Sequence, residues 1–239
     1  MRIPLHPCFI LHQRSYRETS LLLEVFSREH GRVGLIARGA KRKRAIPQGI
    51  LQPYRRLLIA WSGKGELFTL TAIEPDFPSI TLRSEQIMTG FYLNELILRL
   101  LHRHESHSDL FDAYEGALTR LGVGNSEQSI LRIFEKNLLQ SLGYGLVLDH
   151  DVQSGSPIDI SQDYYYQFDL GPLASKPSTS EHIKISGLTL QALQKDCLED
   201  AASLREAKHL MRCILRRHLG GKPLASRELY EAYLLNRGQ

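Results

Sequence analysis

The spacing of apolar residues changes sharply near residue 78, and this change divides the chain into two differently built regions. Before it, short runs of β-branched, aromatic and aliphatic residues alternate with turn-forming residues, a pattern that predicts strands. After Pro75 and Pro78, apolar residues recur at three- and four-residue steps, which is typical of amphipathic helices. We therefore predict an α+β chain with a strand-rich domain at residues 1–78 and a mainly helical domain at 79–239.

The strand-rich region is short for its number of strands. The five predicted strands are CFILHQRSY, SLLLEVFS, GRVGLIARG, ILQPYRRLLIAW and ELFTLTAI. Gly31 can adopt the positive φ of a tight turn, so it predicts a hairpin between the second and third strands. Five short strands without an intervening helix suit a small closed barrel better than a sandwich, and the five-stranded oligonucleotide-binding (OB) barrel has this size.

The predicted helical region is interrupted once. Helices are expected at residues 84–105, 108–122, 126–145, 189–197, 203–221 and 226–237. Residues 145–186 between them are rich in Ser, Gly, Pro and Asp and carry a short aromatic run, YYYQFDL. We predict a loop-and-strand insertion there.

Net charge is concentrated at the amino-terminal end. Residues 1–80 hold 13 Lys and Arg against 6 Asp and Glu, whereas residues 81–239 hold 17 against 20. Such asymmetry indicates that the first domain meets a polyanion. Nucleic acid is the leading candidate, because no segment has the pattern of a membrane-binding amphipathic helix.

A dense group of cations follows the third predicted strand, in the sequence RGAKRKR. A glycine-containing loop of this charge can follow a phosphate backbone. We predict DNA contacts from this loop and from two arginines that precede it: Arg28, Arg32, Arg38, Lys41, Arg42, Lys43 and Arg44. The alternatives are a solvated loop or a nuclear-import signal.

Two further features extend the DNA-binding prediction. On the predicted helix at residues 203–221, four cations spaced three and four apart form one basic stripe: Arg205, Lys208, Arg212 and Arg216. This stripe is either a second DNA surface or an ordinary solvated helix face. Tyr54 lies beside Arg55 and Arg56, which predicts that its ring is exposed and stacks on a base.

The chain lacks the motifs of catalysis and of metal binding. Its Gly-Lys pairs do not complete a phosphate-binding loop, and it carries no nucleophile elbow and no HExxH motif. Its three cysteines, Cys8, Cys197 and Cys213, have no paired spacing, which argues against disulfides and against a thiolate zinc site. We expect no enzymatic activity, no cofactor and no metal. Without an apolar window of membrane-spanning length, the chain is expected to be a cytoplasmic protein.

Four segments of the chain carry a family likeness. They are ETSLLLEVFSREHGRVGLIARGAKRKR at 18–44, GFYLNELILRLL at 90–101, LRIFEKNLLQSLGYG at 131–145 and LGGKPLASRELY at 219–230. Together they resemble the RecO family of bacterial recombination mediators, nearly end to end, and look closest to the members of enteric-type bacteria. The resemblance implies an OB barrel followed by a helical domain. It also implies binding to single- and double-stranded DNA, annealing of complementary strands, and work with RecR to load RecA onto DNA coated by single-strand-binding protein.

One departure from the family concerns zinc. Many members carry a four-cysteine zinc site after the LGY segment, whereas this chain reads VLDHDVQSGSPID there, without cysteine. We therefore expect no zinc in the insertion and assign its packing to Tyr164, Tyr166 and Phe168.

The resemblance also implies a docking site for the tail of single-strand-binding protein, which is acidic and ends in a hydrophobic residue with a free carboxylate. Such a ligand needs an apolar pocket with a cation at its lip. We predict this site on the helix at 126–145, where two cations share an edge beside apolar residues: Arg132 and Lys136, with Leu131, Phe134, Leu138 and Leu139. Arg216 and Arg217 form the second candidate lip, and solvated cations above core leucines are the alternative.

Two other functions suit the same predicted fold. One is an adaptor whose barrel binds only proteins, and the other is an RNA-processing factor. A salt-titrated DNA-binding assay separates the adaptor from a DNA-binding protein, and competition between RNA and DNA of one sequence separates the RNA-processing factor.

Overall fold

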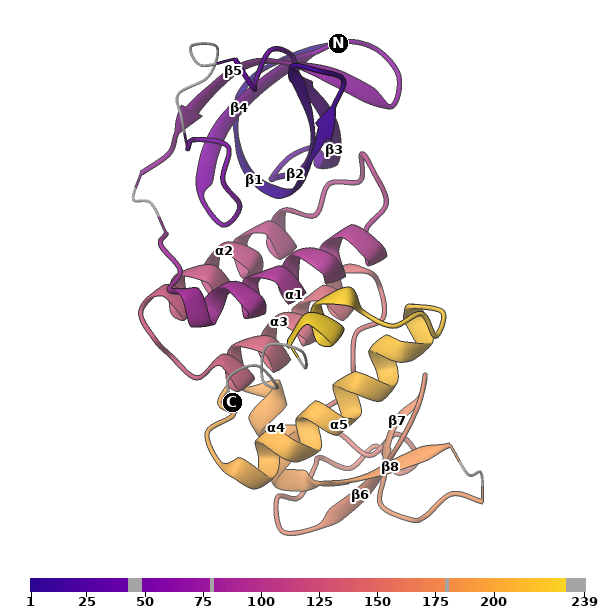
Figure 1. Cartoon of the computed structure of the whole chain (residues 1–239). Helices are drawn as coiled ribbons and strands as arrows, with labels where there is room; N and C mark the ends of the chain where they lie inside the picture. The colour runs from indigo at the N-terminus through magenta and orange to yellow at the C-terminus, as the bar shows by residue number, and fades with distance from the viewer. Residues whose placement is uncertain (43–48, 78–79, 179–180, 231–239) are drawn as a thin grey trace. The chain divides into compact units, whose positions relative to one another are not determined.

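A computed structural model describes residues 1–42, 49–77, 80–178 and 181–230 (Figure 1). Contacts between residues group the chain into two compact units. The first holds Met1–Val123 and the segment that begins at Pro223, and the second holds Gly124–Lys222. Each unit contains its own sheet and its own helices.

The first unit is built around a closed five-stranded barrel (Figure 1). The strands are β1 (Arg2–Tyr16), β2 (Ser20–Ser27), β3 (Gly31–Ala37), β4 (Arg56–Ser62) and β5 (Leu67–Pro75). Their order is β1-β2-β3-β5-β4, and β1 pairs with β4 to close the barrel. Among the strand pairs that the structure describes in the barrel, only β3–β5 is parallel. The prediction of a five-stranded OB-type barrel is confirmed, including the hairpin at Gly31, which has a φ of +62°.

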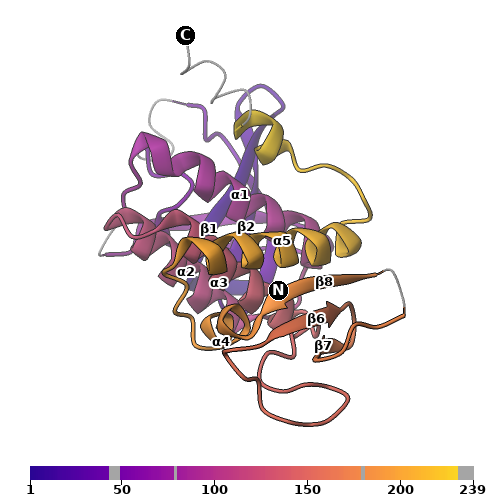
Figure 2. The ribbon, with the colours of Figure 1, turned by 90° about the horizontal axis from the view of Figure 1, so that it is seen from below.

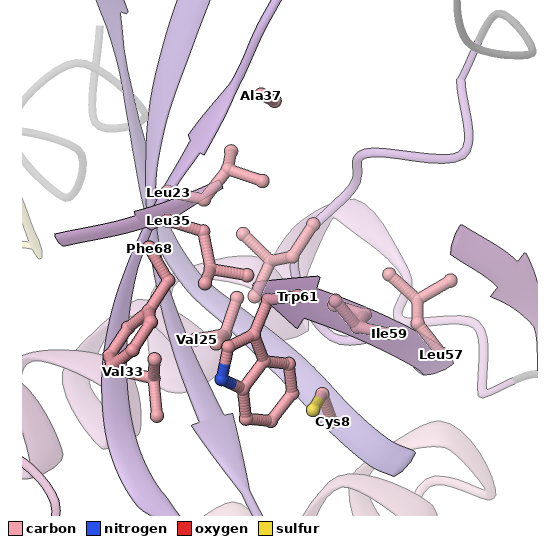
Figure 3. Packing of buried hydrophobic residues seen from close by; sticks show 11 residues of the cluster. Cys8, Leu23, Val25, Val33, Leu35, Ala37, Leu57, Ile59, Trp61 and Phe68 are labelled. Atoms are coloured by element: carbon pink, nitrogen blue, oxygen red, sulfur yellow. The ribbon is translucent and has the colours of Figure 1, made fainter. Parts of the chain in front are cut away.

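Period-2 alternation explains the barrel interior. On β2, Leu23 and Val25 are buried in the interior cluster, whereas Leu22 and Glu24, which alternate with them, line a pocket on the outer face. Trp61, 1% exposed, projects into the interior among aliphatic side chains of the other strands (Figure 3). Burial of these side chains holds the barrel together.

Two helices cover the outer face of the barrel within the first unit: α1 (Ser84–Leu100) and α2 (Ser108–Gly122). The ring of Phe9 on β1 lies 5.1 Å from that of Tyr114 on α2, and Asn94 of α1 donates a hydrogen bond to the Leu11 carbonyl at 2.8 Å. The change from strands to helices falls between β5 and α1, as predicted. Because α1 and α2 share a compact unit with the barrel, a domain boundary at residue 78 stays a prediction from sequence.

The second unit combines three helices with a small sheet. Its elements are α3 (Glu127–Ser141), β6 (Asp163–Gln167), β7 (Gly171–Leu173), β8 (His182–Ser186), α4 (Gly187–Gln194) and α5 (Ala201–His218). The sheet has the order β7-β6-β8, and β8 contacts both α4 and α5 (Figure 2). The predicted loop-and-strand insertion is confirmed. Tyr164 and Tyr166 of β6 are buried, and Phe168 is half-buried.

The last described residues return to the first unit. Ala225–Tyr230 are helical, and the amides of Ala225 and Ser226 donate to the carboxylate of Glu95 on α1, each at 2.8 Å. The rest of the helix predicted at 226–237 lies outside the described residues. No helix in the described part of the chain has the length and apolarity that crossing a membrane requires.

Candidate nucleic-acid interface

Five exposed cations gather at one end of the barrel, where the β1–β2 hairpin turns. Tyr16 pairs with Ser20 to close this hairpin, and β3 runs antiparallel beside β2. The chain after β3 therefore passes the hairpin turn, where the Lys41 amide donates to the Thr19 carbonyl at 3.0 Å. We call the exposed cations of this region the hairpin-end cluster: Arg14, Arg17, Arg38, Lys41 and Arg42.

Two members of the hairpin-end cluster were missed by the sequence analysis. Arg14 and Arg17 lie more than twenty positions before Arg38 and join it only through strand pairing. The guanidinium of Arg17 lies 5.2 Å from the centre of the Tyr16 ring, which is half-buried. The run of polar residues HQRS at 12–15, near the end of β1, was the signal available in the sequence.

The cations of the hairpin-end cluster are available to a ligand. Within the described part of the chain, none of the five takes part in a salt bridge, and Glu18 is the exposed acid nearest to them in sequence. Exposed cations without acidic partners favour an anionic ligand, because no internal ion pair has to be broken. Lys43 and Arg44, predicted to contact DNA, lie outside the described residues.

A pocket on the outer face of the barrel adjoins this cluster. It is lined by His12, Arg14, Leu22, Glu24, Leu67 and Arg103. Register explains the set, because His12 pairs with Glu24 and Arg14 with Leu22 across β1 and β2. Within the pocket, Arg103 is paired with the Glu24 carboxylate. Arg14, beside Leu22 and Leu67, is therefore the lining arginine without a salt bridge among the described residues and the one that suits a base next to a phosphate.

Arg28 is only partly available to DNA. Its Nε and Nη2 atoms donate to the two carboxylate oxygens of Asp112 at 3.0 and 2.8 Å. This bidentate hydrogen bond from Arg28 is the main reason why the pKa of Asp112 lies below its usual value. The pair ties the turn after β2 to α2, so a phosphate would compete with Asp112 for Arg28.

The prediction that Arg32 belongs to an exposed DNA surface is wrong. The Arg32 side chain is 18% exposed, and its Nη1 atom donates to the carbonyls of Leu98 and Leu101 at the end of α1. The guanidinium thus satisfies carbonyls that the helix terminus leaves without partners and complements the helix dipole. Arg32 is occupied in packing α1 on the barrel and is not one of the exposed cations.

The ring of Tyr54, predicted to be exposed, packs against α1. The residue adopts a φ of +66°, and its ring lies against Gly90 of α1. Burial raises the pKa of Tyr54 to about 12. Its neighbour Arg56 bridges Asp76 and Glu115 at 2.7 and 2.6 Å. The Tyr54 ring is half-buried, with one part of it covered by α1, so the prediction of a fully exposed ring is wrong, while base stacking by Tyr54 stays a prediction.

The basic stripe of the second unit is exposed as predicted. Arg205, Lys208, Arg212 and Arg216 all lie on the exposed face of α5, while its apolar face packs on the helices α3 and α4. Within the described residues these four cations form no salt bridge. Whether the stripe binds DNA stays a prediction, since exposure alone also suits a solvated helix face.

The predicted tail-binding site on α3 needs correction at Arg132. Its Nη2 atom donates to Glu135 at 2.7 Å, and the two side chains are only 8% and 1% exposed. Lys136 is also engaged, with the carboxylate of Asp196 at 2.6 Å and the Leu193 carbonyl at 3.0 Å. Leu138 is buried and Leu131 half-buried. A buried, paired arginine cannot form the lip of a surface pocket, because capturing a peptide carboxylate would leave Glu135 without its cation.

The second candidate lip is more open. Arg216 is exposed, whereas Arg217 contacts Glu181 at 2.8 Å and lies 5.0 Å from the centre of the Phe168 ring. Close to them in sequence, His218 stacks on Tyr144, with ring centres 4.1 Å apart. Tyr144 is 53% exposed, so an apolar surface accompanies the cations of this helix end.

Potential metal ligands are few in the described part of the chain. Asp149 and His150 contact each other at 2.7 Å without a third ligand group. One group of three potential ligands, His6, Glu29 and His30, lies on the barrel. It is at the end of the β1–β2 ladder opposite the hairpin-end cluster.

Comparison with known protein families identifies both regions of the chain. Residues 1–76 match the model described as "Recombination protein O N terminal", and residues 84–228 match "Recombination protein O C terminal". The chain belongs to the RecO family. The family resemblance noted in the sequence is confirmed, and membership places the chain among recombination proteins that are not enzymes. The absence of a cysteine zinc site in the insertion stays a prediction.

Individual relatives support the same assignment. The "DNA repair protein RecO" of Nitrosococcus oceani is 48% identical over 231 residues, which cover 97% of this chain and 94% of the relative. The proteins of the same name from Methylococcus capsulatus and from Coxiella burnetii (strain RSA 493) are 42% and 43% identical, over 97% and 95% of this chain and 94% and 98% of theirs. The similarity therefore extends over both units.

Proposed function

We propose that this chain is a DNA-binding recombination mediator that binds single- and double-stranded DNA through the hairpin-end cluster and anneals complementary strands. One observation carries the proposal: five exposed cations from two neighbouring segments of the barrel meet at the hairpin turn, without salt bridges in the described part of the chain. Other barrel-unit arginines, such as Arg28 and Arg56, are engaged by carboxylates. The family name supports a role in recombinational repair.

The proposed mechanism requires no nucleotide hydrolysis. Two complementary strands repel each other through their phosphates, and a cationic surface that contacts both lowers this repulsion and releases counterions. The described residues offer a further cationic surface on α5, formed by Arg205, Lys208, Arg212 and Arg216. This distribution of charge favours an arrangement in which one DNA strand binds at the barrel and the other binds at α5.

Partner binding completes the proposed role. In family terms, the chain acts with RecR in the cytoplasm, associated with the nucleoid, and helps to load RecA onto DNA coated by single-strand-binding protein. The acidic tail of that protein binds near the end of α5, because Arg216 is exposed there and Tyr144 offers an apolar surface close to His218. This placement replaces the α3 site.

Salt dependence of DNA binding tests the proposal. Replacing all five cations of the hairpin-end cluster by Gln should weaken binding to DNA of any sequence and flatten the dependence of log K on log salt concentration. The slope should fall by up to about 0.7 per lost contact on single strands and about 0.9 on duplex. The double variant Lys41→Gln with Arg42→Gln removes two of these five cations. Its matched control is Lys176→Gln with Lys195→Gln, which removes two exposed lysines of the other unit. An unchanged slope in folded protein contradicts the proposal.

Two rival functions have distinct outcomes in the same assay. If the chain is an adaptor that acts through proteins alone, the parent protein should bind DNA no more tightly than the variant with all five cations replaced. An RNA-processing factor would retain RNA when DNA of the same sequence is added in excess. The free cations of the hairpin-end cluster favour a nucleic-acid ligand over the adaptor.

A further inference from the structure

A cluster of two histidines and a glutamate forms at the end of the barrel opposite the hairpin turn. His6 lies on β1, and Glu29 and His30 lie in the turn between β2 and β3. One potential ligand atom from each residue lies within 4.8 Å of those of the other two. The three residues meet because β1 and β2 pair as far as Cys8 and Ser27, after which the turn runs back past β1.

The turn that carries two of these ligands is held from both sides. On one side, the amide of Arg28 donates to the Pro7 carbonyl at 3.2 Å. On the other, a Cβ atom at Gly31 would approach the Glu105 carbonyl to 1.8 Å, so the backbone there is packed against the segment that follows α1. The amide of His104 in that segment donates to the Arg32 carbonyl at 3.0 Å. The turn thus positions its side chains before any ligand arrives.

Contacts among the three side chains do not satisfy His30. Nδ1 of His6 lies 3.6 Å from the Glu29 carboxylate, and the His6 and His30 rings meet edge to face, with centres 5.2 Å apart. The Nε2 atom of His30 is buried and has no hydrogen-bond partner among the described residues. A buried ring nitrogen without a partner costs free energy, and coordination of a cation by that nitrogen is one way to recover it.

We propose that His6, Glu29 and His30 bind a divalent transition-metal ion of the Zn²⁺ class. Two imidazoles and one carboxylate form a recurrent ligand set for zinc, which leaves a coordination position for water or for an external ligand. Imidazole ligands favour Zn²⁺ and Ni²⁺ over Mg²⁺ and Ca²⁺, which prefer oxygen. The 59% exposed side chain of Glu29 gives the ion a route in from solvent.

This site differs from the metal expectation drawn from sequence. That expectation rested on cysteine spacing, and none of the three cysteines belongs to the cluster. His6 stands more than twenty positions before Glu29 and His30, so no metal-binding motif is visible along the chain. A bound ion would fasten the turn after β2 to β1, at a place where the described ladder has ended.

Trp61 provides an intrinsic reporter for the site. It is the single tryptophan of the chain, and its ring centre lies 5.3 Å from that of His30. Ni²⁺, with its unfilled d shell, quenches indole fluorescence at such short range. Binding at the cluster should therefore quench Trp61.

The test uses full-length, tag-free protein under reducing conditions, stripped of metal and then titrated with Zn²⁺ by calorimetry and with Ni²⁺ by fluorescence. One ion should bind, raise the melting temperature and, for Ni²⁺, quench Trp61. Glu29→Gln and His30→Gln should each weaken binding by about ten-fold or more, since even outer-shell changes cost about 10- to 100-fold. His12→Gln removes an exposed histidine of β1, the strand that carries His6, and should leave metal binding unchanged.

Further variants keep the result decisive. Glu29 is exposed, so Glu29→Gln is expected to fold even if His30→Gln does not. Cys197→Ser with Cys213→Ser removes the more accessible thiols as competing ligands and should retain the site. The proposal is overturned if Zn²⁺ does not bind, if Glu29→Gln and His6→Gln bind it as tightly as the parent, or if the cysteine variant loses it.

Discussion

The ring of Tyr54 lies directly on Gly90 of α1, so close that a Cβ atom added at Gly90 would stand 2.7 Å from the ring's Cε1 atom. The Tyr54 hydroxyl also lies 3.5 Å from the Ile87 carbonyl on the same helix. This contact fastens the chain just before β4 to the first helix. It also explains why the ring of a tyrosine flanked by arginines is half-buried rather than exposed.

Gly90→Ala should therefore destabilise the first unit. Alanine in a helix interior is ordinarily more stable than glycine by about 1 kcal/mol, but here the Tyr54 ring must move. Overpacking of this kind costs about 1 to 3 kcal/mol. Gly116→Ala on α2 is the control, because its new Cβ would meet nothing within 4 Å and should stabilise the protein. Urea unfolding of both variants gives the comparison, and equal stabilisation by both would contradict the packing described.

The ion pair between Arg28 and Asp112 should make stability depend on pH in the acid range. The pKa of Asp112 is lowered in the folded state, so its contribution is present above the unfolded-state pKa and is lost as pH falls through the folded-state value. A double-mutant cycle with Arg28→Gln and Asp112→Asn should give a small coupling at neutral pH, because both side chains are half-exposed. The same cycle measured at acid pH, below the folded-state pKa of Asp112, should give a smaller coupling. A coupling that does not change with pH would argue against the pair.

The buried pair of Arg132 and Glu135 should be sensitive to the loss of one partner. Glu135→Gln leaves a buried guanidinium without its anion, a change that costs about 3 to 5 kcal/mol. Replacing both residues, as Arg132→Met with Glu135→Leu, should cost much less, because no buried charge remains. Chemical denaturation measures both effects. If Glu135→Gln costs less than the double replacement does, the pair is not the buried unit described here.

The three cysteines should differ in reactivity. Cys8 is fully buried in the barrel, and burial raises the pKa of its thiol to about 12. A thiol of such pKa is almost entirely protonated at pH 8 and does not attack disulfide reagents. Cys197 is exposed and should react at once. Mass spectrometry after timed labelling distinguishes the sites, and labelling of Cys8 in folded protein as fast as Cys197 would mean that the barrel opens readily.

The stripe on α5 should matter more for annealing than for binding one strand. If it holds the second strand, replacing Arg205, Lys208, Arg212 and Arg216 by Gln should slow annealing of complementary oligonucleotides at low salt. Affinity for one single strand, held at the hairpin-end cluster, should change less. Annealing that proceeds at the parent rate would assign the stripe to a solvated helix face.

Local sequence patterns were sufficient to predict the five barrel strands and the helices α1 to α5, but not the start of β1 at Arg2 or the separate short strands β7 and β8. Alternation along SLLLEVFS and the three- and four-residue steps of α1 and α5 depend only on neighbouring residues, because a strand or a helix sets which side chains share a face. Gly31 could be recognised as a turn for the same reason. The exposed stripe on α5 follows from spacing alone, so it was predicted in full.

The partners of the charged side chains were decided by the tertiary structure. Arg28 meets Asp112 from 84 positions away, and Arg32 meets the Leu101 carbonyl from 69. A sequence shows that a residue is cationic, but whether its charge is free for DNA or used within the fold depends on which distant groups arrive beside it. For the same reason, Arg14 and Arg17 joined the hairpin-end cluster, and His6 met Glu29 and His30, only when the strands paired.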